Sequence, residues 1–280
     1  RSLGQQANRH KKQSRRVLMS PPHSILITGA SSGIGEALAC HYAESGVSLF
    51  LSGRNKERLA GVAAACEAQG ATVYVSTVDV TDRDLMARWI ADIDRETALD
   101  LVVANAGISG GTADGIESET QTRSIFAVNV DGVLNTVLPA LEAMAARSAG
   151  QIAVVSSLAG FLQLPGAPAY SASKAAVRHF GEALRPSAAR RGVGVTVICP
   201  GFVHSRITAA NPFPMPFIMP ADRAAKIIAR GLEKNSTRVA FPWIMYAVAY
   251  TLGQLVPPPL LRILLGRLPE KPAAAATTGI

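Results

Sequence analysis

The sequence predicts an α/β fold in which helices cover both faces of a single doubly wound parallel β-sheet. After Pro21 and Pro22, short runs rich in β-branched residues alternate with alanine-rich stretches of helical length, a pattern typical of repeated β-α units. The 280 residues suit one large α/β domain, and 48% hydrophobic residues are enough for a substantial core. A glycine-rich turn also joins the first expected strand to the first expected helix.

The expected strands are the short apolar runs, and the first of them, Ile25-Leu26-Ile27-Thr28, is expected to be buried. The strands are expected at residues 24–28, 48–52, 72–77, 99–105, 151–156, 193–199 and 238–241. Helices are expected between them, at residues 33–45, 55–69, 83–96, 120–147, 170–191 and 221–235. The proline-rich segment 204–220 is expected to be an insertion within the same domain.

The ends of the chain differ from this α/β domain, which we expect to span residues 23–242. Residues 1–22 form a basic leader for which we expect no order, and residues 243–280 form an apolar extension that ends in a flexible tail. The formal charge of +8 lies mostly in the leader, whose six cations have no acid among them: Arg1, Arg9, Lys11, Lys12, Arg15 and Arg16. Without them, 22 cations face 20 acids, which argues against nucleic-acid binding.

The leader and the cysteines indicate in which cellular compartment the protein is expected. An arginine-rich leader without acids weakly fits organellar import, although trimming or a true start at Met19 is equally open. Cys40, Cys66 and Cys199 lack metal-ligand spacing and fit a reducing compartment. We therefore expect a cytoplasmic protein without a metal site, and organellar import stays open.

A phosphate-binding turn is predicted at Gly29-Ala30-Ser31-Ser32-Gly33-Ile34-Gly35, between the first strand and the first helix. Glycines let the backbone approach a pyrophosphate closely, and a helix N-terminus offers free N–H groups to it. The spacing G-x-x-x-G-x-G departs from the general dinucleotide fingerprint G-x-G-x-x-G. The alternative is a glycine-rich turn without a ligand.

The end of the second strand indicates which dinucleotide is bound. An NAD site would place an Asp or Glu there, on the ribose 2′-hydroxyl. This chain has Leu51-Ser52-Gly53-Arg54 instead, and Arg54 offers a planar fork of donors to a 2′-phosphate. NADP(H) is therefore favoured over NAD(H), unless Arg54 is an ordinary surface residue.

Tyr170 and Lys174 form a candidate proton-transfer pair. They lie four residues apart in an expected helix and therefore share a face. A positive charge near a phenol favours the phenolate, so we expect Lys174 to lower the pKa of Tyr170. Tyr-x-x-x-Lys alone is a weak motif, and it needs support from the rest of the chain.

That support comes from five further features in the expected order: Asp79 after the third strand, Asn105-Ala106-Gly107 after the fourth, Asn129, Ser157 thirteen residues before Tyr170, and Pro200-Gly201. With them, residues 24–242 closely resemble the short-chain dehydrogenase/reductase family. The resemblance implies a single Rossmann-like domain and a homodimer or homotetramer.

The resemblance also implies the catalytic roles. Tyr170 would be the general acid in carbonyl reduction and the base in alcohol oxidation, and Lys174 would hold the nicotinamide ribose. Ser157 would bind the substrate oxygen, and Asn129 would hold a water that relays protons to Lys174. The alternatives are that Ser157 only caps a strand end, that Ser156 takes its place, and that Asn129 is structural.

The same resemblance implies the cofactor contacts. Asp79 and Val80 would hold the adenine, and the segment Asn105-Ala106-Gly107 would line the cofactor, although both could be turn chemistry. The full implied set is Gly29, Ser31, Ser32, Gly33, Ile34, Gly35, Arg54, Asp79, Val80, Asn105, Ala106, Gly107, Tyr170, Lys174, Pro200, Gly201, Val203 and Ser205. The chain departs from the family pattern at Ala104, at Ser205 in place of a threonine, and at Pro186, which should kink its helix.

The substrate is expected to be a small apolar carbonyl or alcohol, of lipid, steroid-like or acyl type. The covering segment 202–220 is rich in aromatic and aliphatic residues, as is the stretch after Ser157: Phe202, Ile207, Phe213, Met215, Phe217, Ile218 and Met219, with Leu158, Phe161, Leu162 and Leu164. These side chains could instead belong to the core or a subunit interface. Two other functions stay open, a 3-oxoacyl-thioester reductase and a nucleotide-sensing scaffold without catalysis.

The C-terminal extension begins with an uncharged apolar run over residues 239–261. The run from Trp243 is interrupted at Pro257 and is too short to span a bilayer. We expect it to be buried against the protein or a partner subunit, or to lie in a membrane interface through residues 239–268, with Arg262 and Arg267 at the headgroups.

Overall fold

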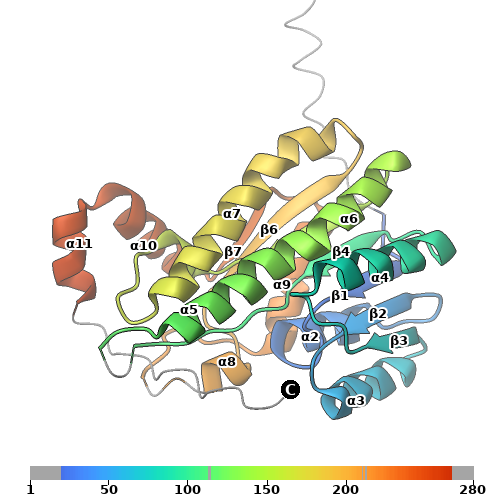
Figure 1. Ribbon diagram of the computed structural model, residues 1–280, viewed down its shortest axis with the longest axis horizontal. Coiled ribbons are helices and arrows are strands. Elements are labelled where there is room, and N and C mark those ends of the chain that lie inside the picture. The colour runs from blue at the N-terminus through green and yellow to red at the C-terminus, as the bar shows by residue number, and fades with distance from the viewer. Residues whose placement is uncertain (1–19, 113–114, 210, 212, 267–280) are drawn as a thin grey trace, which may run out of the picture.

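The computed structural model describes residues 20–112, 115–209, 211 and 213–266. Within them, seven parallel strands form one sheet in the order β3-β2-β1-β4-β5-β6-β7 (Figure 1). The strands are β1 Ser24–Ile27, β2 Ser48–Ser52, β3 Thr72–Ser76, β4 Leu101–Ala104, β5 Gln151–Val155, β6 Gly194–Pro200 and β7 Arg238–Phe241. The strand order reverses between β1 and β4, so the predicted doubly wound fold is confirmed.

Helices cover both faces of the sheet because successive residues of a strand point to opposite sides. In β1, Ile25 and Ile27 pack in one core with α2 Gly33–Tyr42, α3 Lys56–Glu67 and α9 Ala221–Glu233. Leu26 packs in the other core with α4 Arg83–Glu96, α6 Gly132–Ala146 and α7 Pro168–Ala189. In Figure 1, α6 and α7 cross in front of the sheet.

The expected elements match closely, with one correction. The long helix expected at 120–147 is three segments, α5 Glu119–Phe126, a π-helical turn η1 Ala127–Asp131, and α6. Residues 119–146 are also the one stretch, among the described residues, long and apolar enough to cross a membrane. They pack against α4 and α7, as a core helix of a globular domain does.

The ends of the chain are partly described. Residues 1–19 and 267–280, which include most of the expected leader and the expected tail, lie outside the described residues. Residues 243–265 form two helices that no strand-helix pattern predicted, α10 Trp243–Leu255 and α11 Pro258–Leu265. A short helix α8 Arg206–Ala209 lies within the covering segment, and α7 runs on through Pro186.

The topology gathers the predicted site at one edge of the sheet. The carboxyl ends of parallel strands meet at the same edge. The glycine turn follows β1, Asn105 follows β4, Ser157 follows β5 and Gly201 follows β6. Segments that are far apart in the chain therefore surround one crevice.

Candidate active site

The three glycines of the turn after β1 stand where a side chain would clash. Gly29 and Gly33 adopt φ angles of +67° and +61°, which only glycine adopts readily. A methyl group on Gly35 would lie 2.5 Å from the carbonyl oxygen of Gly29 and 2.6 Å from Nδ2 of Asn105. Backbone therefore lines this turn, as close approach of a pyrophosphate requires.

The N-terminus of α2 adds free hydrogen-bond donors to the turn. Ser32 is the N-cap residue, and its side chain makes no capping hydrogen bond. The first N–H groups of a helix lack partners within it, and the helix dipole places partial positive charge there. The glycine turn and this helix end together fit a dinucleotide phosphate.

Asn105 and Thr28 connect the glycine turn to β4. Thr28 Oγ1 accepts hydrogen bonds from the backbone N–H groups of Asn105 and Ala106, at 3.0 and 3.1 Å. Asn105 Nδ2 donates to the carbonyl oxygens of Thr28 and Gly29, at 2.9 and 3.1 Å. These four bonds fix the turn against the wall that the segment Asn105-Ala106-Gly107 forms.

Arg54 lies at the end of β2, where the sequence places it. The neighbouring Gly53 faces the turn, since a methyl group on it would lie 3.1 Å from Cβ of Ser31. Arg54 is exposed, and Asn55 caps α3 by accepting from the Arg58 N–H at 2.8 Å. Arg54 is therefore an exposed residue that directly follows the glycine packed against Ser31.

Tyr170 and Ser157 meet through their hydroxyl groups. A hydrogen bond joins the two side chains, and the Ser157 hydroxyl also donates to the carbonyl oxygen of Pro200 at 3.4 Å. Ser156 is buried and donates instead to the carbonyl oxygen of Lys174 at 2.7 Å, so its hydroxyl is used within the fold. Ser157 also accepts from the Ala159 N–H at 3.1 Å, the capping role of the alternative interpretation. The Ser157 hydroxyl can bond Tyr170 and cap Ala159 at the same time, because a hydroxyl has two lone pairs and one donor.

The pKa of Tyr170 corrects one expectation. The residue is half-exposed as a whole, but its hydroxyl is buried, and this burial raises its pKa. The hydrogen bond with Ser157 acts in the opposite direction and is the weaker effect. Lys174 Nζ lies 5.9 Å from the ring centroid of Tyr170. The sequence led us to expect that Lys174 lowers the pKa of Tyr170, whereas in this structure burial raises it.

Lys174 is buried in the core beneath Tyr170. Its Nζ donates to the carbonyl oxygen of Val155 at 3.0 Å, and the residue is 4% exposed. Burial lowers its pKa to about 8, because taking an ammonium out of water disfavours the charged form. Lys174 therefore gains or loses a proton close to neutral pH.

The buried amine should make stability depend on pH. Between pH 8 and the usual lysine pKa of about 10.5, the unfolded chain holds a proton that folded Lys174 lacks, so stability rises with pH. In cofactor-free protein, the unfolding free energy of wild type relative to Lys174→Met should rise by about 1 to 3 kcal/mol from pH 7 to pH 10. Urea titration at both pH values measures this, and a pH-independent difference would show that the amine does not titrate there.

Asn129 lies in the π-helical turn between α5 and α6. It is fully buried, its Oδ1 accepts from the Ile108 N–H at 2.8 Å, and its Nδ2 donates to Ile108 O and Ser173 Oγ, both at 3.0 Å. A methyl group on Gly107 would lie 3.2 Å from Asn129 Oδ1 and 3.3 Å from Lys174 Nζ. Asn129 and Lys174 therefore flank Gly107, and π-helical turns occur frequently at functional sites.

Asp79 forms a turn after β3. Its Oδ1 accepts from the backbone N–H and the hydroxyl of Thr81, both at 2.9 Å. Val80 is buried, and its carbonyl oxygen accepts from Asn135 Nδ2 at 2.9 Å. These bonds are the turn chemistry of the alternative interpretation, and a role of either residue in adenine binding stays a prediction.

The covering segment leaves β6 and is closed at its base. The His204 N–H donates to Met219 O at 2.9 Å, and the Met219 N–H donates to Phe202 O at 3.1 Å. Val203 and Met219 are buried at this base. Ser205 caps α8 through Thr208, and a methyl group on Gly33 would lie 2.9 Å from Ser205 Cβ. The structure therefore brings Ser205 against the glycine turn.

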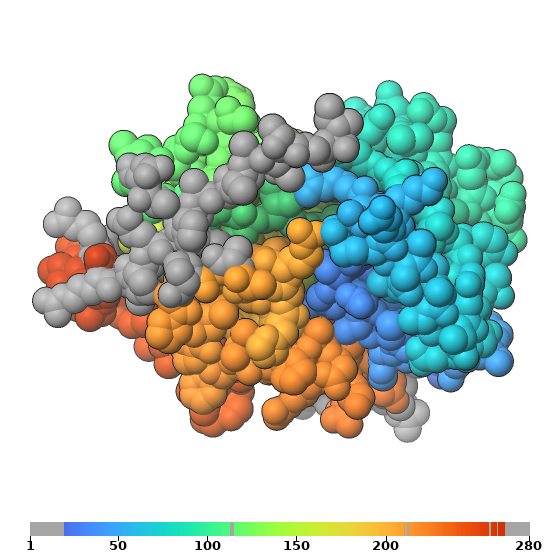
Figure 2. All heavy atoms as spheres, turned by 90° about the horizontal axis from the view of Figure 1, so that it is seen from below, coloured from blue at the N-terminus to red at the C-terminus, as the bar shows by residue number. Residues whose placement is uncertain are grey.

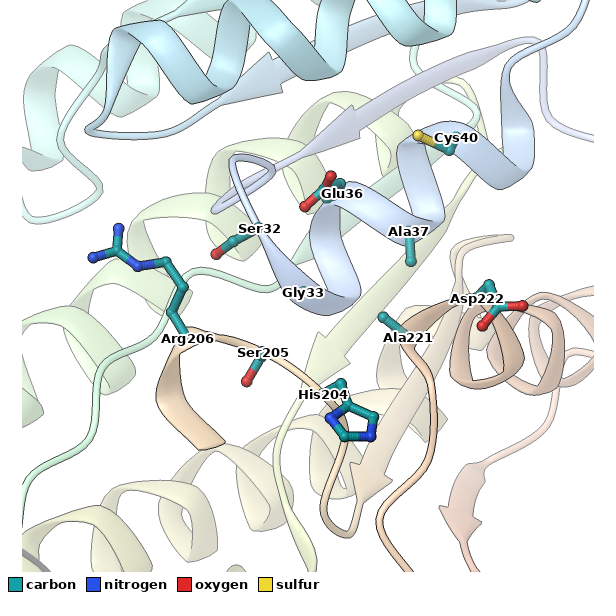
Figure 3. Close-up of a pocket in the computed structure, with 10 residues that line it drawn as sticks. All are labelled: Ser32, Gly33, Glu36, Ala37, Cys40, His204, Ser205, Arg206, Ala221 and Asp222. Atoms are coloured by element: carbon teal, nitrogen blue, oxygen red, sulfur yellow. The ribbon is translucent and has the colours of Figure 1, made fainter. Parts of the chain in front are cut away.

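A cavity of about 530 Å³ opens where α2, α8 and α9 meet. Figure 3 shows Ser205 and Arg206 across from Ser32 and Gly33, and the view in Figure 2 places this part of the chain, in orange, against the blue N-terminal segment. Ser32 and Gly33 of the glycine turn line this cavity, whereas Tyr170, Ser157 and Lys174 do not. Arg206 is a residue whose only signal in the sequence is its place next to Ser205, so it could not be selected from the sequence alone.

Two further residues that the sequence analysis missed position the catalytic helix. Glu117 accepts from the Ala169 N–H at 2.8 Å, so a distant carboxylate caps the N-terminus of α7, whose own N-cap Ala167 has no side-chain acceptor. Ser173 accepts from Asn129 and donates to Tyr170 O at 2.8 Å. Ser173 lies within the Tyr-to-Lys motif, but nothing in the sequence links Glu117 to α7.

The chain matches known proteins over most of its length. A family model described as short chain dehydrogenase matches residues 23–212. An uncharacterized oxidoreductase of Myxococcus xanthus is 41% identical over 88% of this chain and 97% of its own, and one of Mycobacterium tuberculosis is 33% identical over 85% and 95%. A solved 3-ketoacyl-ACP reductase of Sinorhizobium meliloti is 27% identical, with a TM-score of 0.70 over 80% of this chain and 99% of that one. The geometry of the crevice and these matches agree: the chain belongs to the short-chain dehydrogenase/reductase family, whose members are oxidoreductases with an NAD(P)-binding fold.

Proposed function

We propose that this protein is an NADP(H)-dependent oxidoreductase that interconverts a carbonyl and an alcohol on an apolar substrate. The observation that carries the proposal is the hydrogen bond between Tyr170 and Ser157, with Lys174 buried beside them at the carboxyl edge of the sheet. When bound, the nicotinamide supplies or accepts the hydride. The residues of the protein then handle the substrate oxygen and its proton.

Tyr170 is the proposed proton donor in carbonyl reduction. Its raised pKa keeps the hydroxyl protonated at neutral pH, so it has a proton to give to the developing alkoxide. Ser157 hydrogen-bonds the same oxygen as negative charge grows on it. In alcohol oxidation Tyr170 is the base, and Ser157 holds the hydroxyl in place.

Lys174 and Asn129 are proposed to position the cofactor and replace the proton. Lys174 Nζ has three donors and uses one on Val155 O, which leaves donors for the hydroxyls of the nicotinamide ribose. A pKa of about 8 suits proton exchange near neutral pH. Asn129, on the other side of Gly107, is proposed to hold the water through which protons reach Lys174.

The proposed preference for NADP(H) rests on Arg54. A guanidinium forms charge-assisted, often bidentate, hydrogen bonds with a phosphate. Arg54 is exposed and follows Gly53, which packs against Ser31 of the glycine turn, and no carboxylate in Leu51-Ser52-Gly53-Arg54 would repel a 2′-phosphate. This geometry supports NADP(H) as the preferred cofactor.

Arg54→Ala should weaken NADPH binding by about 10- to 100-fold, because a charge-assisted hydrogen bond contributes about 1.5–3 kcal/mol. NADH affinity should change little. Arg95→Ala is the matched control, since Arg95 is an exposed arginine near the end of α4, away from the carboxyl edge. Fluorescence titration with both cofactors measures the four affinities, and equal weakening of NADPH and NADH by Arg54→Ala would make Arg54 structural.

We propose an apolar substrate because the residues next to the hydroxyls of Ser157 and Tyr170 are apolar. Leu158 and Phe161 follow Ser157 and are buried, and no charged residue lies between Ser157 and Tyr170. Val203 and Met219 form the base of the covering segment on the other side. The segment after Ser157 itself offers no cation to a carboxylate or phosphate, and the guanidinium groups that contact Phe161, those of Arg178 and Arg238, are both engaged with Glu182.

A 3-oxoacyl-thioester reductase is the second candidate, because the similar Sinorhizobium meliloti structure is a 3-ketoacyl-ACP reductase. An acidic carrier would need a basic docking patch. Arg178 is buried beside Glu182, and Arg185 donates to Asn235. Arg190 and Arg191 are exposed, but they follow α7 at the opposite edge of the sheet from Ser157. These arginines do not form a patch at the crevice.

The proposal also includes a homodimer or homotetramer. Phe126 on α5 and Leu138 on α6 are exposed apolar residues that a second copy would cover. Light scattering on the purified protein measures the oligomer size.

Turnover of NADPH against a carbonyl panel tests the function. The panel holds medium-chain aldehydes, cyclic ketones and 3-oxoacyl thioesters, both free and attached to an acyl carrier. Oxidation of NADPH by the free apolar carbonyls supports the proposal, and oxidation only by carrier-bound thioesters selects the second candidate. Tight NADPH binding without oxidation by any of them would favour a scaffold without catalysis.

A further inference from the structure

The C-terminal hairpin, defined as α10 and α11, is attached to the wall of the active site by its inner face. The Phe161 ring contacts Tyr246 and Tyr250, with centroids 5.4 and 6.1 Å apart. Ala249 is buried, and a methyl group on Gly253 would overlap the carbonyl oxygen of Phe161. Phe161 belongs to the short helix Leu158–Phe161 that directly follows Ser157. The hairpin is therefore in close contact with the segment that carries a catalytic hydroxyl.

Polar contacts hold α10 in the same orientation. Arg238 Nη1 donates to the Tyr246 hydroxyl at 2.7 Å, and Arg238 pairs with Glu182 at 2.6 Å. Glu182 lies on α7, two turns beyond Lys174. The hairpin is thus fixed to the catalytic helix as well as to the wall.

The outer face of the hairpin is exposed and apolar. Trp243 is 73% exposed and Leu255 is 72% exposed. The other exposed members of the outer face are Ile244, Val248, Leu260, Ile263 and Leu264, and the inner-face residue Tyr250 is also partly exposed. Large exposed apolar patches mark sites of contact with a protein or a membrane. Figure 1 shows the hairpin at one end of the molecule, opposite α3 and β3.

The charge pattern favours a lipid surface over a protein partner. Protein interfaces carry a polar rim around their apolar centre. Residues 239–261 hold no charged residue, whereas the chain directly beyond them, residues 262–271, carries three cations and one acid. Trp243 and Tyr250 are the aromatic types enriched at the membrane–water boundary. An apolar face that is followed in the sequence by a basic stretch fits anionic lipid headgroups.

The length of the hairpin excludes a transmembrane arrangement. The 13 residues of α10 extend about 20 Å, whereas a bilayer core is about 30 Å thick. We propose that the C-terminal hairpin docks this protein on an anionic lipid surface, with both helices lying in the interfacial region. This docking does not require the proposed reaction.

Docking would place the active-site wall next to the lipid. A methyl group on Gly201 would lie 3.4 Å both from Sδ of Met245 on α10 and from Cδ1 of Leu158. The start of the hairpin therefore borders the residues that follow β6 and β5 in the crevice. If the proposed function holds, apolar substrates that partition into membranes would be taken up at this surface.

Vesicle co-sedimentation at low salt tests the docking. The vesicles contain phosphatidylcholine with or without phosphatidylglycerol. Wild type should pellet with the anionic vesicles, and the double variant Trp243→Glu/Leu255→Glu should bind at least about tenfold more weakly. Tyr74→Glu/Val75→Glu is the matched control, because both residues are exposed on β3 at the other end of the molecule. It should bind as wild type does.

Further readouts separate the alternatives. Circular dichroism shows that each variant is folded, and Arg262→Gln/Arg267→Gln should weaken binding to anionic vesicles specifically. Wild type that stays in the supernatant would overturn the proposal. A wild-type dimer that the Trp243/Leu255 variant converts to monomer, without vesicle binding, would assign the face to a second copy instead. Carbonyl reduction is measured separately without vesicles, so the failure of either proposal leaves the other standing.

Discussion

Tyr170→Phe should lower kcat by at least about 100-fold and leave the Kd for NADPH nearly unchanged. The substitution removes the hydroxyl that hydrogen-bonds Ser157 and keeps the ring that fills the site. Without it, the proton for the developing alkoxide has to come from a group that is not positioned for transfer. Steady-state kinetics with an accepted carbonyl, together with NADPH titration, separates the two effects.

Tyr42→Phe is the control for this result. Tyr42 is also partly buried, but it ends α2 and its hydroxyl lies near Glu233, away from the catalytic hydroxyls. It should keep wild-type kcat. A Tyr170→Phe enzyme that retained most of its turnover would remove Tyr170 from the chemistry.

Lys174→Ala should raise the Kd for NADPH by at least about tenfold and also lower kcat, since it deletes both the donors for the ribose and the cation beneath Tyr170. Its effect on affinity should therefore exceed that of Tyr170→Phe. Comparison of the two variants distinguishes Lys174, which is expected to bind the cofactor and to take part in proton transfer, from Tyr170, which is expected only to transfer a proton.

Isothermal titration of NADPH measures the affinities, with Lys226→Ala on the exposed side of α9 as the control. Lys226→Ala should bind NADPH as wild type does. If Lys174→Ala bound NADPH with wild-type affinity, the amine would have no part in holding the ribose, and its burial would need another explanation.

The sequence predicted the sheet, and it proposed most of the candidate catalytic residues, because these signals are local. An apolar run such as Ile25-Leu26-Ile27 indicates a buried strand by itself. The pairing of Tyr170 with Lys174 could be predicted from one helix, and the place of Arg54 could be predicted from the end of one strand. The structure adds that these segments meet at one edge and that Ser157, and not Ser156, faces Tyr170.

The features that the sequence did not predict depend on contacts between distant segments. Glu117 caps a helix that begins 51 positions later. Asn129, in the π-helical turn, is held by hydrogen bonds with Ile108 and Ser173. The raised pKa of Tyr170 arises from burial, which no spacing of residues reveals. The apolar run that begins at Trp243 can be seen in the sequence, but only the fold shows which of its side chains pack against the rest of the protein.

Transfer of deuterium from doubly 4-deuterated NADPH to an apolar ketone is the most direct test of the central claim. The enzyme and its Tyr170→Phe variant are incubated with the labelled cofactor, and the alcohol is analysed by mass spectrometry. Wild type should form alcohol with deuterium on the carbinol carbon, and Tyr170→Phe should form it at least about 100-fold more slowly. Alcohol without that label, or equal rates for the two enzymes, would contradict hydride transfer with Tyr170 as the proton donor.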